Sequence, residues 1–180
     1  MVLAGILIGV GVVANLTAEN SIIGSFLFSL GLLSIIKLKL PLFTGKVGFP
    51  QFTWNYKMKV LLLNLIGVGA LVFFSCIANE NLVELLKTAA AAKFSKDFLA
   101  LFAKAYLCGI LIHLAVTIKQ DLITVLCVMG FILIGAEHCI ADFPYLLINI
   151  SFINIIKYLT IVLGNTAGAL FLQQLLTEGS

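Results

Sequence analysis

The sequence predicts an all-α membrane protein with six transmembrane helices, arranged as a 3+3 inverted repeat in which the second and fifth helices are broken. The 180 residues are 62% hydrophobic and only 11% charged, with a mean hydropathy of +1.17, whereas soluble domains are about one quarter charged. Residues 107–116 (LCGILIHLAV) repeat residues 3–12 (LAGILIGVGV) at six of ten positions. Polar and turn residues interrupt the apolar sequence once in each half, at 37–46 and 135–142. Three spans in each half would turn the second half upside down, and many membrane transport proteins build a pathway from such repeats.

The first half contains three expected spans. The first covers about 2–17 and ends at the polar residues 19–21. The second covers 22–38, breaks near 39–41 and continues as a short re-entrant segment from Leu42. A connection rich in Gly, Pro and aromatic residues (45–56) leads to the third span at 57–77, because such residues favour turns and interfacial positions.

The second half repeats this order. Residues 78–95 form the longest polar stretch and are expected to hold a surface helix. The fourth span covers 96–118, the fifth covers 121–136 and breaks at 137–142, Pro144 restarts a half-helix to about 150, and the sixth span covers 152–176. The chain is therefore predicted to be one domain, 1–180, with repeat A at about 1–77 and repeat B at about 96–180.

Lysines set the expected orientation. The 37–59 connection holds five of the eleven lysines, which favours a cytoplasmic position for this connection and for both termini. The chain has no arginine, so a nucleic-acid partner is not expected. The expected surroundings are a lipid bilayer, and the bias toward lysine, isoleucine, asparagine and phenylalanine is typical of a bacterial inner membrane.

Ionisable residues inside apolar segments are expensive and by default indicate function. His138 lies between Glu137 and Asp142 at the break in the fifth span, where imidazole could hold or pass a proton. Its alternative role is a structural bridge between the two broken segments. Lys93 lies at the outer entrance of the fourth span, and His113, inside that span, is expected to make an interhelical hydrogen bond.

Other polar and aromatic residues complete the predicted site. Thr44, in the other broken segment, could donate to His138 or to a solute, or could instead cap a helix. Asn165 lies near the expected pore, and it and Asn64 could also satisfy the freed backbone of the broken segments. Candidate apolar gates, which stop ions and admit neutral molecules, are Phe28, Phe43 and Phe131.

Metal and enzyme chemistry are not predicted. The four cysteines lie in apolar sequence without C-x-x-C spacing, so neither a metal site nor a cofactor is expected. Glu137-His138 is not part of an H-E-x-x-H motif, and no serine–lysine or paired-aspartate arrangement is present. The chain is therefore not expected to be an enzyme.

Three motifs give the sequence a family resemblance. Residues 28–31 (FSLG) with 42–45 (LFTG), residues 135–142 (GAEHCIAD) and residues 163–168 (LGNTAG) resemble, in order and spacing, the second, fifth and sixth spans of the formate/nitrite transporter family. The resemblance covers roughly 3–172. The chain departs from the family where an asparagine is replaced by Gly109, an acidic residue by Pro41, and the signature asparagine by Asp142.

The resemblance implies an aquaporin-like fold, a homo-pentamer with one pore in each protomer, and passage of small monovalent anions of weak acids. It implies a pore centre formed by His138 and Thr44, with Asn165 close by, and a vestibule lysine, Lys93. Glu137 and Asp142 would support this centre. The implied outer constriction is Phe28 and Phe131, and the implied inner one is Leu32, Leu42 and Phe43.

These observations predict a passive or proton-coupled channel or transporter for a small weak-acid anion of the formate, nitrite and hydrosulfide class. Its partners are the anion and a proton, and His138 would assist protonation of the anion. Two alternatives remain open, namely a pore for neutral small solutes and a membrane scaffold of the same fold that does not conduct.

Overall fold

The computed structural model describes residues 1–179, and within that range it contains eight helices and no strand. The helices are α1 (Val2–Thr17), α2 (Ser21–Lys37), α3 (Trp54–Ala78), α4 (Asn81–Phe94), α5 (Phe98–Ile118), α6 (Asp121–Leu133), α7 (Cys139–Ile148) and α8 (Phe152–Glu178).

Polar residues at the ends of the apolar runs determine where the helices begin. The Asn20 side chain accepts hydrogen bonds from the backbone N–H groups of Ile22 and Ile23, which start α2. Thr53, Asp97 and Ser151 cap α3, α5 and α8 in the same way. Because the first N–H groups of a helix have no partner within the helix, such caps stabilise its start.

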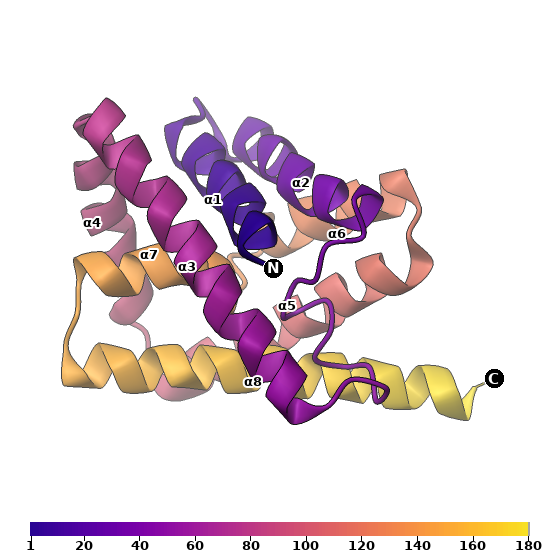
Figure 1. The fold of residues 1–180 in the computed structure, drawn as a ribbon. Helices are drawn as coiled ribbons and strands as arrows, with labels where there is room; N and C mark the ends of the chain where they lie inside the picture. The colour runs from indigo at the N-terminus through magenta and orange to yellow at the C-terminus, as the bar shows by residue number, and fades with distance from the viewer. Residues whose placement is uncertain (180) are drawn as a thin grey trace.

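The helices form two groups with a similar arrangement (Figure 1). In the first group α1 packs against α2 and α3, and in the second α5 packs against α6 and α8. Contacts between α2 and α6 join the groups, while α4 packs on α7. The repeated sequences at 3–12 and 107–116 thus occupy the helices that pack against α3 and α8, respectively.

The α1–α3 and α5–α8 contacts are the most extensive between helices, and in both a glycine brings the two backbones close together. A Cβ atom added to Gly5 of α1 would lie 2.0 Å from the backbone oxygen of Asn64 in α3. One added to Gly109 of α5 would lie 2.3 Å from the backbone oxygen of Asn165 in α8. Only glycine permits this backbone separation, because small residues let apolar helices approach closely. Gly109 is thus explained by packing.

Within residues 1–179, three helices are long and apolar enough to cross a membrane, namely α3, α5 and α8. Helices α1, α2, α6 and α7 are apolar but shorter, and a full span needs about 20 residues. Large apolar side chains lie on the outside of the molecule, including Leu99 at 78% and Phe152 at 80% exposure. These faces suit lipid or another subunit rather than water.

The two interruptions differ from the predictions in their details. Residues 38–53 contain turns and no helix. The alternative that Thr44 caps a helix is therefore wrong, whereas re-entry of the chain from Leu42 stays a prediction. In the second half α6 ends at Leu133 and α7 begins at Cys139, earlier than the predicted restart at Pro144. Pro144 lies inside α7, at the cost of one backbone hydrogen bond.

Candidate functional site

The centre of the candidate site is a contact between the two interruptions. Thr44 lies in the 38–53 segment, and His138 lies in the 134–138 segment just before α7. The Thr44 hydroxyl oxygen lies 2.9 Å from His138 Nε2, and both residues are buried, with exposures of 0% and 2%. The structure therefore brings together two residues that are 94 positions apart in the sequence.

The hydrogen bonds of the His138 ring define its tautomer. The backbone N–H of Ala141 donates to Nδ1 at 3.1 Å, so Nδ1 is an acceptor and carries no proton. The ring proton is then on Nε2, which donates to Thr44. His138 is also the N-cap residue of α7, so one imidazole both starts a helix and joins the two interruptions.

Two asparagines hold the interruptions in place. Asn165 of α8 accepts from the Cys139 N–H at 2.8 Å and donates to the backbone oxygens of Ala105 and Glu137, each at 2.8 Å. Its amide is thus fully used by backbone groups, and Asn165 lines neither cavity described below. This favours a positioning role over contact with a solute.

Asn64 of α3 has the matching position in the first half. It accepts from the Phe43 N–H at 2.9 Å and donates to the backbone oxygens of Met1 at 2.8 Å and Pro41 at 3.2 Å. Each half therefore uses one buried asparagine on its long helix to satisfy irregular backbone, which must find partners away from water.

Aromatic rings lie against the central pair. The Phe28 and Phe131 rings meet edge to face, with centroids 5.6 Å apart, and the Phe131 ring stacks on the His138 ring at 5.9 Å. Both phenylalanines are buried and line the same cavity as His138. This contact places two aromatic rings beside the His138–Thr44 pair, and their role as an outer constriction stays a prediction.

The predicted inner constriction is less uniform. Leu32, Leu42 and Phe43 are all buried, with exposures of 1%. Leu42 lines the second of the two cavities described below, whereas Leu32 and Phe43 line neither cavity and lie in the surrounding core.

A cavity of about 330 Å³ lies beside His138 and is lined by residues of α1, α2, α4, α5, α6 and α7 and of the segments that precede α5 and α7. Lys93 of α4 forms ion pairs with Glu137 and, at 2.9 Å, with Asp142 Oδ1. Lys96 contacts the other Glu137 oxygen at 3.2 Å. Burial opposes a charged Lys93, but the carboxylates of Asp142 and Glu137 outweigh it and raise the Lys93 pKa. Asp142 Oδ1 is thus paired with Lys93, whereas Asp142 Oδ2 has no hydrogen-bond partner.

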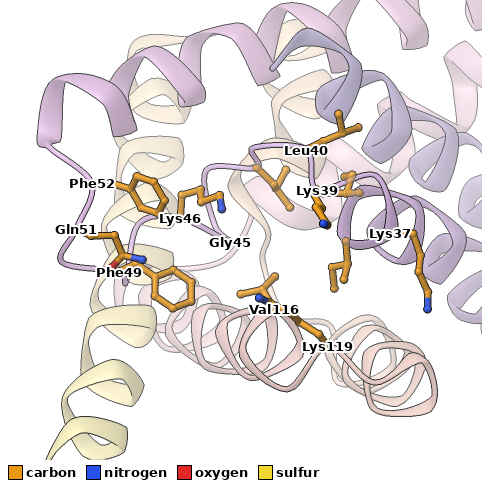
Figure 2. Close-up of a pocket in the computed structure, with 13 residues that line it drawn as sticks. Lys37, Lys39, Leu40, Gly45, Lys46, Phe49, Gln51, Phe52, Val116 and Lys119 are labelled. Carbon is orange, nitrogen blue, oxygen red and sulfur yellow. The ribbon is translucent and has the colours of Figure 1, made fainter.

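A second cavity, of about 530 Å³, is lined by residues of the 38–53 segment, the end of α2 and the end of α5. Figure 2 shows Lys39, Lys46 and Lys119 around the same opening, with Phe49 and Phe52 nearby. The lysines of the 37–59 connection are visible in the sequence and favour an orientation, but the cavity that some of them line was not predicted. The available sequence signal was the clustering of these lysines near two glycines. Lys119 is distant in the sequence and approaches the other lysines only in the folded protein.

His113 makes the predicted interhelical hydrogen bond. Its Nε2 lies 2.9 Å from Gln173 Oε1, which connects α5 to α8, and its ring packs on Phe49 with centroids 4.7 Å apart. His113 lines neither cavity. In residues 1–179, no group of three or more His, Cys, Asp or Glu side chains could hold a metal ion.

Known proteins share this sequence pattern and this fold. The sequence model of the formate/nitrite transporter family matches residues 1–178. A pentameric formate channel with formate bound has a similar structure, with a TM-score of 0.77 and 23% identity over 93% of this chain and 89% of that one. An ion channel of the FNT family gives a TM-score of 0.84 and 20% identity over 99% of this chain and 88% of that one. No curated protein matches.

Proposed function

Because this chain belongs to the formate/nitrite transporter family, we propose that it is a channel or transporter for small monovalent anions of weak acids, the class of formate, nitrite and hydrosulfide. It is an integral membrane protein, as the family and the apolar helices α3, α5 and α8 indicate. The observation that carries the proposal is the buried His138–Thr44 pair. His138 lines one cavity, and Leu42 and Gly45, which flank residues 43 and 44 in the sequence, line the other.

We also propose the finer architecture, six spans in a 3+3 inverted repeat with breaks after α2 and α6. The matched contacts of Gly5 with Asn64 and of Gly109 with Asn165 support repeats at about 1–77 and 96–180. Five copies, each with its own pore, are proposed by analogy with the similar channel, which is pentameric. A bacterial inner membrane with both termini in the cytoplasm remains part of this proposal.

The proposed route runs from the 330 Å³ cavity beside Lys93 past Phe28 and Phe131 to His138 and Thr44. It continues past Leu42 and the core residues Leu32 and Phe43 into the 530 Å³ cavity. The unpaired part of the lysine charge attracts anions into the first cavity, and Asn165 and Glu137 support the central pair.

Charge explains why a proton is needed at the centre. A bare anion loses its hydration between phenylalanine and leucine side chains without gaining a full set of partners, which is costly. A proton supplied at or through His138 converts the anion into the neutral acid, which can pass. The acid then releases the same proton on the far side, so one anion and one proton cross together.

One alternative has its own structural support. The hydrogen bonds of His138 fit a neutral imidazole with an Nε2–H donor. Such a donor also suits a pore for neutral solutes. The case for a non-conducting scaffold is weaker, because Gly109, which departs from the family pattern, is explained by the close contact with Asn165.

Flux measurements in liposomes test the proposal. The protein is reconstituted, and formate, nitrite and hydrosulfide uptake is followed by stopped flow across a range of pH. In His138→Asn the side-chain oxygen can still cap α7, but the titratable ring is lost, so we expect about a 10²-fold slower flux, typical of a lost general acid.

The Thr44→Ser and Thr44→Val variants supply the matched pair. Serine keeps the hydroxyl next to Nε2 and should retain flux, whereas valine keeps the shape and should lose most of it. Unchanged flux with unchanged pH dependence in His138→Asn would remove the proton role. Flux that is independent of pH and of solute charge in the native protein would favour the neutral pore.

A further inference from the structure

The 530 Å³ cavity differs from the cavity near His138 in its charge balance. Lys39, Lys46 and Lys119 line it, and none of the three has a carboxylate within ion-pair distance in residues 1–179. Lys37, at the edge, is paired with Asp121 at 2.6 Å. In the other cavity, by contrast, Glu137 and Asp142 take up most of the lysine charge.

Two of these lysines have a left-handed backbone conformation. Lys39 has φ of 53° and Lys119 has φ of 58°, and in residues 1–179 they are the two non-glycine residues with positive φ. Helix termination accounts for both, because Lys119 is the left-handed C-cap of α5 and Lys39 follows α2, where the Leu40 N–H bonds to the Ile35 oxygen. The two helix ends thereby place both lysines on the rim of one cavity (Figure 2).

The third lysine shows that the positive charges affect one another. Lys46 is half-buried, with its ammonium 4.9 Å from the centroid of the Phe52 ring. Burial, with a further contribution from the Lys119 charge, lowers the Lys46 pKa. A bound anion would relieve this repulsion, and lysine ammonium groups are common phosphate binders.

We propose that this cavity binds a multivalent phosphate anion, either a free polyphosphate or organic phosphate or the phosphorylated headgroup of a lipid. Three unpaired ammonium groups around one opening match an anion of three or more charges better than a monovalent solute. The cavity volume of about 530 Å³ accommodates such a group, and Phe49 and Phe52 provide an apolar surface beside it.

Binding would also close the proposed route from this side. Leu42 forms part of the cavity wall and lies next to the buried Phe43 and Thr44, and a multiply charged ion cannot lose its hydration to pass them. The bound anion therefore inhibits flux. This second step rests on the proposed function, whereas binding itself does not.

The experiment uses inorganic triphosphate as the probe. Binding to the full chain in nanodiscs of neutral phosphatidylcholine is measured by isothermal titration calorimetry. We expect Lys46→Gln and Lys119→Asn each to weaken binding about three- to tenfold, an effect in the upper range of exposed charge pairs. Asparagine is used at position 119 because it tolerates the left-handed conformation.

Lys59→Gln is the matched control. It removes one exposed lysine near the start of α3, and Lys59 does not line the cavity. Equal binding by Lys59→Gln and the native protein supports a local site. Equal weakening in all three variants, or no triphosphate binding in neutral discs, overturns the proposal.

A second arm identifies the source of the phosphate. The same titration is repeated in nanodiscs that contain a phosphorylated inositol lipid. If the triphosphate affinity of the native protein is unchanged, the site binds a free anion. If the lipid lowers the triphosphate affinity of the native protein, and lowers it less in Lys119→Asn, the site binds the lipid headgroup. In liposomes, triphosphate added to the side that exposes this cavity should inhibit formate flux in the native protein and less in Lys46→Gln. Triphosphate binding without inhibition of flux overturns the blocking step alone. If the native protein shows no flux, the proposed function is contradicted, and calorimetry still tests whether the cavity binds triphosphate.

Discussion

Replacing Asn165 by alanine should destabilise the protein strongly, even though Asn165 lines neither cavity. The substitution removes three buried hydrogen bonds of 2.8 Å. It leaves the Cys139 N–H and the Glu137 carbonyl without these partners in the segment that carries His138.

Two estimates bound the loss of unfolding free energy. Interhelical hydrogen bonds in a membrane protein average about 0.6 kcal/mol each, which gives about 2 kcal/mol for three. Leaving two buried backbone groups unsatisfied costs about 1–3 kcal/mol each, or up to about 6 kcal/mol. We therefore expect Asn165→Ala to lose about 2–6 kcal/mol.

Reversible unfolding in mixed detergent micelles, followed by circular dichroism, measures this loss. Asn64→Ala should show a loss of similar size, because Asn64 makes the equivalent three bonds in the first half. Thr166→Val is the control, since the Thr166 hydroxyl bonds only within its own helix, to the Val162 oxygen, and should change stability by less than about 0.5 kcal/mol. A loss below about 1 kcal/mol in Asn165→Ala would refute the positioning role.

Three further predictions concern packing, charge and pH. Gly109→Ala places a Cβ 2.3 Å from the Asn165 oxygen and should lower thermal stability by about 1–3 kcal/mol, whereas Gly130→Ala, with no atom within 4 Å of the added Cβ, should raise it by up to about 1 kcal/mol. Lys93→Gln removes the ion-pair partner of the buried Asp142 carboxylate and leaves Glu137 with Lys96 alone, so it should cost about 3–5 kcal/mol in the same unfolding assay, and adding Asp142→Asn should recover part of that loss. Because the Lys46 pKa lies below its ordinary 10.5, calorimetry should show triphosphate binding weakening as pH rises toward 10.5, and from a lower pH in the native protein than in Lys119→Asn.

Helix positions could be predicted well because the apolar runs end at polar residues that also cap the helices. The first helix has the predicted bounds of 2–17, and the other long helices begin or end within about three residues of the predicted positions. Asn20 and Ser151 are typical N-cap residues, visible in the sequence. Six spans in an inverted repeat stay a prediction, since three of the helices in the described part of the chain reach a full membrane length.

The interruptions were harder to predict because their caps are unusual. Helix α7 begins after His138, whose ring nitrogen takes the role that a serine or aspartate usually has, and the sequence signal at Pro144 placed the restart too late. In the first half Gly45, Gly48 and Pro50 favour turns, and no helix follows Thr44. The two halves thus share their long helices and asparagines but not the short helix.

The site was predicted in part. His138 could be selected as an ionisable residue in apolar sequence, and its contact with Thr44 was proposed from the matching interruptions and is present. The roles of these residues in permeation stay predictions. The lysine-lined cavity could not be predicted, because Lys119 meets Lys39 and Lys46 only after α2 and α5 have packed into their places.

The double use of the His138 ring couples its protonation to the first turn of α7. A second proton would occupy Nδ1, the atom that now accepts the Ala141 N–H, so an imidazolium must release that amide. Each charging event would therefore loosen a helix start for as long as the ring holds both protons. Hydrogen exchange at the Ala141 amide should accelerate when substrate and a pH gradient drive turnover. Its rate would report protonation of the His138 ring, which a flux measurement does not resolve.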